Sequence, residues 1–309
     1  MNITALQLAG ITGGELHGNA STSFNGIMTD SRSSGTGHDM LFIALRGPNH
    51  DGHRFIAQLF SRGVCLFLVD TLPDETGFMA GVTFVKVSDT LEALHSLAAW
   101  RRNGFHGKVI TVTGSAGKTI VKEWLAEVLG TTVNVIRSPK SYNSQIGVPL
   151  SLINIDDRYD VAVIEAGISK PGEMERLALL IRPDTVIITN VADAHGENFS
   201  GKEAIAAEKL KLASGAGLII YNADDKIISD EIAAHHAGLR SFTWSLSATV
   251  ATLMADRTEK TDNGVLLRCS YDGAIFVTAI PFSDRASVEN AVTVIAASLS
   301  EALPAENII

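Results

Sequence analysis

The strongest chemical signal in the sequence is a glycine turn that ends in a lysine and a threonine: Gly114-Ser115-Ala116-Gly117-Lys118-Thr119. A β-branched run precedes the turn, and apolar residues at helical spacing follow it. Strand, turn and helix together are the context of a phosphate-binding loop. Glycines let backbone N–H groups turn toward an anion, and the helix start adds partial positive charge. We therefore expect Lys118 to reach the β/γ-phosphates of a nucleotide and the Thr119 hydroxyl to ligate Mg²⁺.

This turn is shorter than the full P-loop pattern. The full pattern places a glycine at position 112, where the sequence has Val112. A bare Gly-Lys-Thr also occurs by chance and is then a simple turn with a solvated lysine. The flanking strand and helix favour phosphate binding over that alternative.

Three further residues could take part in the same chemistry. Glu165 ends an apolar strand predicted over Val161–Glu165, where a carboxylate is costly without a cation, so Mg²⁺ is favoured over a simple strand-end hydrogen bond. His195 lies in a loop just past a later strand, and a metal or phosphate role stands equal to a structural or solvated one. Lys209 falls in the apolar stripe of a predicted helix over 201–214. Either it snorkels to solvent, or it points into the site as an ion-paired, deprotonated or modified lysine.

Composition limits the class of protein. The 309 residues suffice for about two domains. Hydrophobic residues make up 46% and charged residues 19%, so a sizeable core is expected. A net charge of −9 argues against general binding to nucleic acid or a membrane surface. With no secretory signal and no apolar run of about 20 residues, we expect a cytoplasmic protein.

The periodicity predicts an α/β fold with two domains. Residues 1–105 form a small α/β unit, and Asn103-Gly104 is the expected linker to a second domain over 106–309. After the glycine loop, apolar strands alternate with helices, which predicts a mostly parallel sheet covered by helices. Ligands gather at the carboxyl ends of such strands, where Gly114, Glu165, Asn190 and Asp224 all fall. Short strands over 249–256, 264–271 and 274–280 predict an added small antiparallel sheet.

With these residues assembled, the chain resembles the Mur ligases, ATP-dependent enzymes of peptidoglycan synthesis, over nearly its whole length. Thr29-Asp-Ser-Arg32 and Asp51-Gly-His53 look like the family's UDP-binding N-terminal domain. The glycine turn matches the family's ATP loop, which has this short form. A valine at position 112 in place of glycine is therefore compatible with ATP binding. Asn143-Ser-Gln-Ile-Gly-Val-Pro149 is similar to the segment that touches the muramoyl substrate.

The resemblance implies roles for single residues. It places Mg²⁺ on Thr119 and Glu165, and a second metal on His195 and a carbamylated Lys209. It gives catalytic roles to Lys118, Lys209 and His195, and places ATP on the turn itself. It implies contacts with the UDP substrate at Ser31, Arg32, Asn49, His50 and Asn143. The chain departs from the family pattern before the last helix of the central domain, at Ala286-Ser-Val-Glu-Asn-Ala291. Of the adenine contacts in that pattern, only Asn290 remains in this chain.

Among family members, the chain is most similar to those that add D-alanyl-D-alanine to UDP-N-acetylmuramoyl-tripeptide through an acyl phosphate. The resemblance leads us to expect that the family's third, amine-binding domain is missing from this chain. It also suggests the N-terminal part of a fusion with an alanine racemase, whose pyridoxal phosphate half is not in this chain. Three alternatives stay open: a non-catalytic nucleotide- or UDP-sugar-binding fragment, a sister ligase that adds another amino acid, and an unrelated P-loop kinase.

Overall fold

The computed structural model describes residues 2–32, 37–47, 49–73, 81–192, 198–247, 250–261 and 264–303. The chain divides into two compact units, Met1–Gly104 and Phe105–Ile309. This division lies next to the dipeptide Asn103-Gly104. Among the described residues, no helix is both long enough and apolar enough to cross a bilayer.

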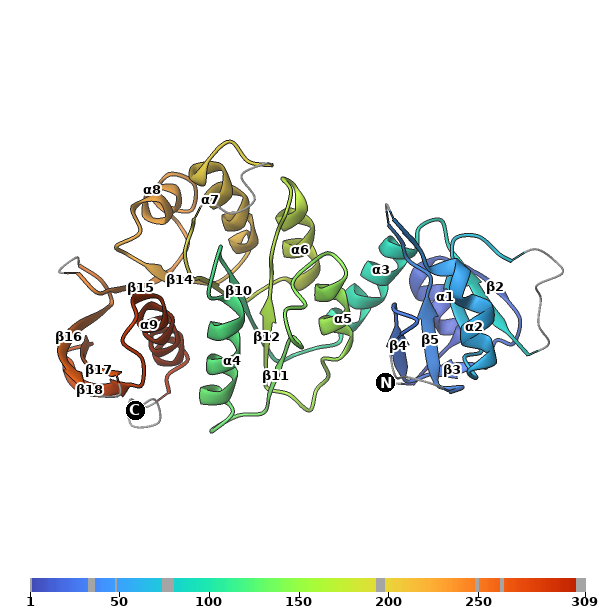
Figure 1. Ribbon diagram of the computed structural model, residues 1–309, viewed down its shortest axis with the longest axis horizontal. Coiled ribbons are helices and arrows are strands. Elements are labelled where there is room, and N and C mark those ends of the chain that lie inside the picture. Colours follow the sequence, from blue (N-terminus) through green and yellow to red (C-terminus); the bar gives the residue numbers. More distant parts are fainter. Residues whose placement is uncertain are drawn as a thin grey trace. The chain divides into compact units, whose positions relative to one another are not determined.

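The first unit is built on a five-stranded sheet in the order β2-β9-β8-β5-β4 (Figure 1). The strands from β4 to β9 pair in parallel, and β2 is antiparallel to β9. The sheet strands are β2 (Glu15–His17), β4 (Gly26–Met28), β5 (Met40–Ile43), β8 (Leu66–Val69) and β9 (Thr83–Lys86). The short antiparallel pairs are β1 (Ile3–Thr4) with β3 (Ser23–Phe24) and β6 (Arg46–Gly47) with β7 (His50–Asp51). The helical segments are α1 (Ala5–Thr12), the 3₁₀ turn η1 (Gly52–Phe55), α2 (Ile56–Ser61) and α3 (Thr90–Asn103).

The central strands of this unit are apolar on both faces because both faces are covered. Phe42, Phe67 and Phe84 lie in one core cluster with residues of α2, and the successive ring centroids are 5.6–6.2 Å apart. The alternate residues Leu41 and Leu66 are buried as well. A parallel strand buried on both faces reads as a continuous apolar run, which is what residues 40–45 show.

The second unit is built on a nine-stranded sheet in the order β11-β12-β10-β13-β14-β15-β16-β17-β18 (Figure 1). Pairing is parallel from β11 to β16 and antiparallel from β16 to β18. The strands are β10 (Lys108–Thr113), β11 (Val135–Arg137), β12 (Val161–Glu165), β13 (Thr185–Ile188), β14 (Leu218–Asn222), β15 (Ser241–Ser245), β16 (Leu253–Thr261), β17 (Gly264–Tyr271) and β18 (Ala274–Ile280). The helical segments are α4 (Lys118–Leu129), α5 (Gly147–Ile153), α6 (Glu173–Ile181), α7 (Lys202–Leu210), η3 (Lys211–Ala213), α8 (Lys226–His235) and α9 (Arg285–Ser300).

Helices α4 and α9 pack together against this sheet, as Figure 1 shows. Alternation along β10 directs Ile110 and Val112 into the core cluster that these helices share. Thr111 and Thr113 therefore face the other side of the sheet, and both are buried there. The strand thus runs through the centre of the unit and ends at the glycine turn.

The predicted fold class is confirmed: strands alternate with helices in a mostly parallel sheet, and an antiparallel segment follows. The antiparallel strands are not a detached sheet, because β15 pairs with β16 and joins them to the parallel part. The sequence pattern did not predict β11, α5 and β15. Each is seven residues or shorter, and α5 carries Pro149 in its first turn, where proline is tolerated but hides the helical pattern.

Candidate active site

The glycine turn joins β10 to α4 at the carboxyl edge of the parallel sheet. Gly114 has φ 147° and Gly117 has φ 80°, both in the region that favours glycine. A Cβ atom at Gly114 would collide with Thr189 Oγ1, and one at Gly117 would collide with Asn290 Oδ1. The turn therefore needs glycine at both positions, and it brings the predicted adenine contact Asn290 of α9 beside the loop.

The backbone of the turn is held by the end of β13. Ser115 N–H donates to Asn190 O at 2.9 Å, and Ala116 N–H donates to Asn190 Oδ1 at 3.0 Å. Thr189 Oγ1 donates to Ala116 O at 2.5 Å. Two of the N–H groups expected to cradle phosphate are thus already bound. The N–H groups that open helix α4 have no partner within the helix, so they are the ones directed to an anion.

Two lysines converge on the same carbonyl of the turn. Lys118 Nζ donates to Gly114 O at 2.9 Å and to Ser115 O at 3.3 Å. Lys209 Nζ, from α7, donates to Gly114 O at 3.0 Å. The Lys209 residue is 2% exposed, so it does not snorkel to solvent as one alternative held. The tertiary structure brings this lysine, 91 positions after Lys118 in the sequence, to the phosphate loop.

Burial controls the protonation of both amines. It lowers the pKa of Lys118, against an opposing effect of the Glu165 charge. Burial also lowers the pKa of Lys209 to about 8, and the nearby Lys118 ammonium adds to that lowering. Lys209 is therefore the amine in this site with a substantial neutral fraction near physiological pH.

Glu165 forms the acidic side of the site. It is 1% exposed at the end of β12. Its Oε2 accepts from Thr119 Oγ1 at 2.8 Å, and its Oε1 accepts from Asn143 Nδ2 at 2.7 Å. Ser141 Oγ lies 3.3 Å from Thr119 Oγ1. A carboxylate and a hydroxyl beside a phosphate loop are the oxygen ligands that Mg²⁺ prefers, so these residues fit the ion.

The protein ligands alone do not enclose a metal. Among the described residues, no group of three or more His, Cys, Asp or Glu side chains is arranged to hold one. Mg²⁺ commonly takes one or two carboxylates and completes its shell with water and substrate phosphates, so Thr119 and Glu165 suit it. The predicted ligand His195 lies outside the described residues.

In the first unit, two of the predicted substrate residues line one pocket. Asn49 and His50 border a cavity of about 350 Å³. The described lining is Arg46, Gly47, Asn49, His50, Asp51 and Arg54. The His50 ring stacks on Phe55 with centroids 5.6 Å apart. The pocket therefore combines two guanidinium groups with a stacked ring, which suits an anionic ligand that carries polar groups.

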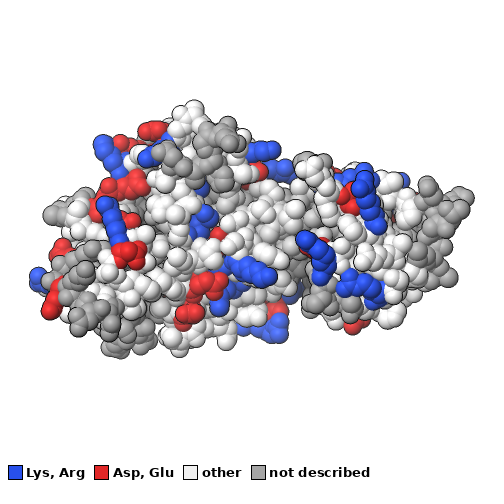
Figure 2. All heavy atoms as spheres, viewed as in Figure 1, with Lys and Arg blue, Asp and Glu red and all other residues white. Residues whose placement is uncertain are grey.

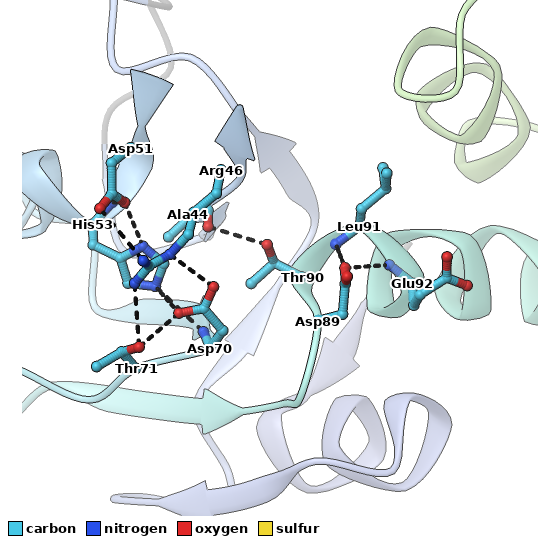
Figure 3. Close-up of polar contacts among 10 residues, drawn as sticks. All are labelled: Ala44, Arg46, Asp51, His53, Asp70, Thr71, Asp89, Thr90, Leu91 and Glu92. Atoms are coloured by element: carbon cyan, nitrogen blue, oxygen red, sulfur yellow. Dashed lines mark hydrogen bonds and ion pairs between the residues drawn. The ribbon is translucent and has the colours of Figure 1, made fainter. Parts of the chain in front are cut away.

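The pocket wall is fixed by a charged network, drawn in Figure 3. Arg46 Nε lies 2.9 Å from Asp70 Oδ2, and Arg46 Nη2 donates to Thr71 Oγ1 at 3.2 Å. The His53 ring bridges two carboxylates, with Nδ1 2.7 Å from Asp51 Oδ1 and Nε2 3.2 Å from Asp70 Oδ1. This network orients the Arg46 side chain at the pocket.

The other predicted substrate residues lie elsewhere. Ser31 and Arg32 are not among the described lining residues of this pocket. Arg32 is exposed and bonds to Asp30, and that hydrogen bond lowers the Asp30 pKa to about 2. Ser31 is buried, and its carbonyl accepts from Arg62 at 2.6 Å. Asn143 belongs to the second unit, where it contacts Glu165. The sequence motifs thus did not specify which of these residues share a cavity.

The surface of the chain carries both signs of charge. Figure 2 shows lysine and arginine side chains interspersed with aspartate and glutamate over the face in view. Several of these groups pair directly, for example Lys226 with Asp230 at 2.7 Å and Arg285 with Glu289 at 2.7 Å. The positive groups at the candidate site are Lys118, Lys209 and the start of α4.

A family model described as the Mur ligase middle domain matches residues 112–298, which span the glycine turn, Glu165, Lys209 and Asn290. The chain belongs to the Mur ligase family. A second model, described as the catalytic domain of the Mur ligase family, matches residues 23–102. The family predicted from the sequence motifs is confirmed.

Within the family, the proteins similar to this chain include a UDP-N-acetylmuramoyl-tripeptide–D-alanyl-D-alanine ligase and solved structures of MurF. The UDP-N-acetylmuramoyl-tripeptide–D-alanyl-D-alanine ligase of Bacillus subtilis (strain 168) is 35% identical over 213 residues, which cover 68% of this chain and 46% of that protein. A crystal structure of MurF from Acinetobacter baumannii has a TM-score of 0.89 and 26% identity, and the match covers 100% of this chain and 67% of that one. MurF ligase from Thermotoga maritima, solved with ADP, has a TM-score of 0.78 at 21% identity and covers 90% and 63%, which shows the shared fold. The chain spans about half the length of the Bacillus relative.

Proposed function

We propose that this chain is the nucleotide- and UDP-substrate-binding part of an ATP-dependent Mur ligase that adds D-alanyl-D-alanine to UDP-N-acetylmuramoyl-tripeptide. The observation that carries the proposal is the convergence of Lys118, Thr119, Glu165 and Lys209 at one carboxyl edge of the sheet. A cation, a metal-binding pair and a buried amine meet there around a phosphate loop. This set suits transfer of a phosphoryl group from ATP to a carboxylate.

In this proposal the terminal carboxylate of the tripeptide takes the γ-phosphoryl group of ATP and ADP leaves. The amine of the dipeptide then attacks the acyl phosphate, which forms the amide bond and releases phosphate. Lys118 binds the β/γ-phosphates, and Asn290 contacts the adenine. Thr119 and Glu165 would hold one Mg²⁺, which would neutralise phosphate charge. Lys209, as a carbamate, would hold a second metal together with His195. The chain's own part in the chemistry is positioning and charge stabilisation, because phosphoryl transfer needs little covalent chemistry from the protein.

The first unit is proposed to bind the UDP part of the substrate. The Asn49 and His50 pocket, with the Arg46 and Arg54 guanidinium groups, suits a diphosphate. Ser31, Arg32 and Asn143 are proposed to contact the same substrate. A cytoplasmic location follows from this proposal, because a UDP-linked precursor and ATP are both substrates. Fusion to an alanine racemase stays a prediction.

A second function has one observation in its favour. The chain spans about half the length of its Bacillus relative, and a part of the family fold that binds nucleotide or UDP-sugar without turnover is the second candidate. A sister ligase with a different incoming amino acid is the third candidate.

The test is nucleotide binding by calorimetry in the presence of Mg²⁺. The Lys118→Ala variant should lose about 10- to 100-fold in ADP affinity, the amount expected for charged hydrogen bonds to phosphate. Lys226→Ala, which replaces an exposed lysine of the same unit, is the matched control and should bind as the wild type does. Equal ADP affinity in the wild type and in Lys118→Ala would refute the assignment of the loop.

Turnover separates the first two functions. Phosphate release with ATP, UDP-N-acetylmuramoyl-tripeptide and D-alanyl-D-alanine together indicates the ligase. Binding of ADP and of the UDP substrate without phosphate release indicates the binding fragment. Replacing the dipeptide by other amino acids in the same assay tests the sister ligases.

A further inference from the structure

Lys122 is a buried lysine that the proposed chemistry does not use. It lies on α4, one turn after Lys118, and it is 0% exposed. Its Nζ donates to Ser138 O at 2.8 Å and to Lys140 O, and Glu123 Oε1 lies 2.9 Å away. An ammonium has three donors, and these three contacts can use all of them. A buried cation this completely satisfied has a defined place, because any movement leaves a donor unpaired.

The carbonyls that bind Lys122 belong to a segment that reaches the metal end of the candidate site. This segment, residues 138–143, follows β11. Ser141 Oγ lies 3.3 Å from Thr119 Oγ1, and Asn143 Nδ2 donates to Glu165 Oε1 at 2.7 Å. The path of the 138–143 segment therefore decides whether these two side chains reach Thr119 and Glu165.

The backbone conformation of the 138–143 segment must be stabilised by contacts from outside the segment. Lys140 has φ 50°, a left-handed backbone that is unfavourable for a residue other than glycine. Such a residue persists when surrounding contacts determine its position. The hydrogen bond from Lys122 to the Lys140 carbonyl is such a contact, and the bond to Ser138 O fixes the start of the segment.

We propose that Lys122 is a positioning residue, a built-in cation that locks the 138–143 segment onto α4 and so sets Ser141 and Asn143 against Thr119 and Glu165. The binding of ADP and Mg²⁺ at the site rests on the proposed function. The hydrogen bonds from Lys122 that lock the 138–143 segment are a property of the chain itself. The Lys122 ammonium affects the site mainly by holding the 138–143 segment and less by its charge on Glu165. The reason is that Glu123 Oε1, 2.9 Å from Nζ, neutralises the ammonium from a shorter distance than Glu165 Oε2 at 3.8 Å.

The first experiment compares Lys122→Met with the matched control Lys226→Met. The first change retains most of the side-chain volume and loses the donors, whereas the second makes the same substitution at an exposed lysine of α8 that pairs only with Asp230 among the contacts described. We expect amide hydrogen exchange over residues 138–143 to accelerate at least about 10-fold in Lys122→Met. The Mg²⁺ concentration for half-maximal ADP binding should rise about 10- to 100-fold, as for residues that orient metal ligands. ADP affinity without Mg²⁺ should stay unchanged, and Lys226→Met should match the wild type in every measurement.

The second experiment asks for rescue by a free cation. Lys122→Ala leaves a cavity lined by two carbonyls and the Glu123 carboxylate, and ethylammonium can occupy it. We expect ethylammonium to restore both the slow exchange and the wild-type Mg²⁺ dependence, while ethanol at the same concentration restores neither. A residue that only fills volume would respond equally to both.

Wild-type exchange and Mg²⁺ dependence in Lys122→Met would overturn the inference, as would equal rescue by ethanol. If Lys122→Met does not fold, Lys122→Gln takes its place, because the amide keeps two donors for the carbonyls but its shorter reach and lost charge still weaken the lock. A wild-type chain that binds no ADP at any Mg²⁺ concentration contradicts the proposed function instead. The exchange measurement then still decides whether Lys122 locks the segment.

Discussion

Lys209 makes a quantitative prediction about pH and stability. The perturbation is Lys209→Met, which keeps a long unbranched side chain in the apolar stripe of α7 and removes the amine. Burial lowers the folded-state pKa from 10.5 to about 8. At about 1.4 kcal/mol for each pH unit, that difference corresponds to about 3 kcal/mol.

The sign follows from proton binding. Between pH 8 and 10.5 the unfolded chain binds the lysine proton and the folded chain has released it. The wild type therefore gains stability relative to Lys209→Met as pH rises through this window, and the gain is complete above the unfolded pKa. We expect the free energy of unfolding of the variant, minus that of the wild type, to fall by about 3 kcal/mol between pH 7 and 10.5.

The assay is urea unfolding at a series of pH values in buffers free of carbon dioxide, so that the amine stays unmodified. Fluorescence of Trp124 and Trp244 reports on the second unit. Lys211→Met is the control, because its pKa is raised by the bond to Glu208. The wild type keeps that contribution up to the unfolded pKa of 10.5 and loses it only above that pH, so the control difference should stay flat between pH 7 and 10.5. A Lys209→Met difference that stays flat from pH 7 to 10.5 would refute the reasoning.

The same amine has a chemical consequence. With a pKa of about 8, roughly a fifth of Lys209 is neutral at pH 7.4, against less than about 0.1% for a lysine with the ordinary pKa. A neutral amine is the form that reacts with carbon dioxide to give a carbamate. We expect a ¹³C resonance from labelled bicarbonate in the wild type that is missing in Lys209→Met. A wild-type spectrum without that resonance at saturating bicarbonate would contradict carbamylation.

Three further predictions concern the loop, the metal and the first unit. Gly114→Ala should lower the stability of the second unit by about 3 kcal/mol in a urea titration, because its Cβ would strike Thr189 Oγ1 at φ 147°. Glu165→Gln keeps the side-chain shape but removes the charge, so the Mg²⁺ requirement of ADP binding should rise while metal-free binding is unchanged; an unaltered Mg²⁺ titration would remove Glu165 from the metal site. Asp89→Ala deletes the N-cap of α3 drawn in Figure 3, where Oδ1 accepts from Leu91 N–H at 2.7 Å and Glu92 N–H at 3.0 Å, and should cost the first unit about 1 kcal/mol in thermal unfolding. Asp89→Asn, which keeps a capping oxygen, should lose only a few tenths, and equal losses in both variants would exclude the cap as the cause.

The local sequence pattern alone predicted several structural elements and the burial of one site residue. The apolar run Val161–Glu165 predicted β12 with its observed bounds, because a strand buried on both faces must be apolar throughout. The glycine turn and its flanks predicted the strand, loop and helix around Lys118. Helical spacing placed Lys209 in an apolar stripe, and the residue is buried. Each of these inferences depends on neighbours within a few positions of sequence.

Lys122 shows where the same reasoning was incomplete. It lies three residues before Leu125 and seven before Leu129 on the buried side of α4, so the rule that singled out Lys209 also applies to it. Its partners, however, are carbonyls 16 and 18 positions away in a loop. No periodicity in the helix specifies such partners.

The tertiary structure alone decided which groups meet. Strand order sets β12 and β13 on either side of β10, so that Glu165 and Asn190 flank the glycine turn. That order left two loop amides bound to Asn190 and brought Asn143 to Glu165. Hydrogen bonds and ion pairs act over a few ångströms, whereas Asn143 and Glu165 are separated by 22 positions in the sequence, and Gly114 and Lys209 by 95. Only the packed sheet, with its fixed order and register, brings them within that range.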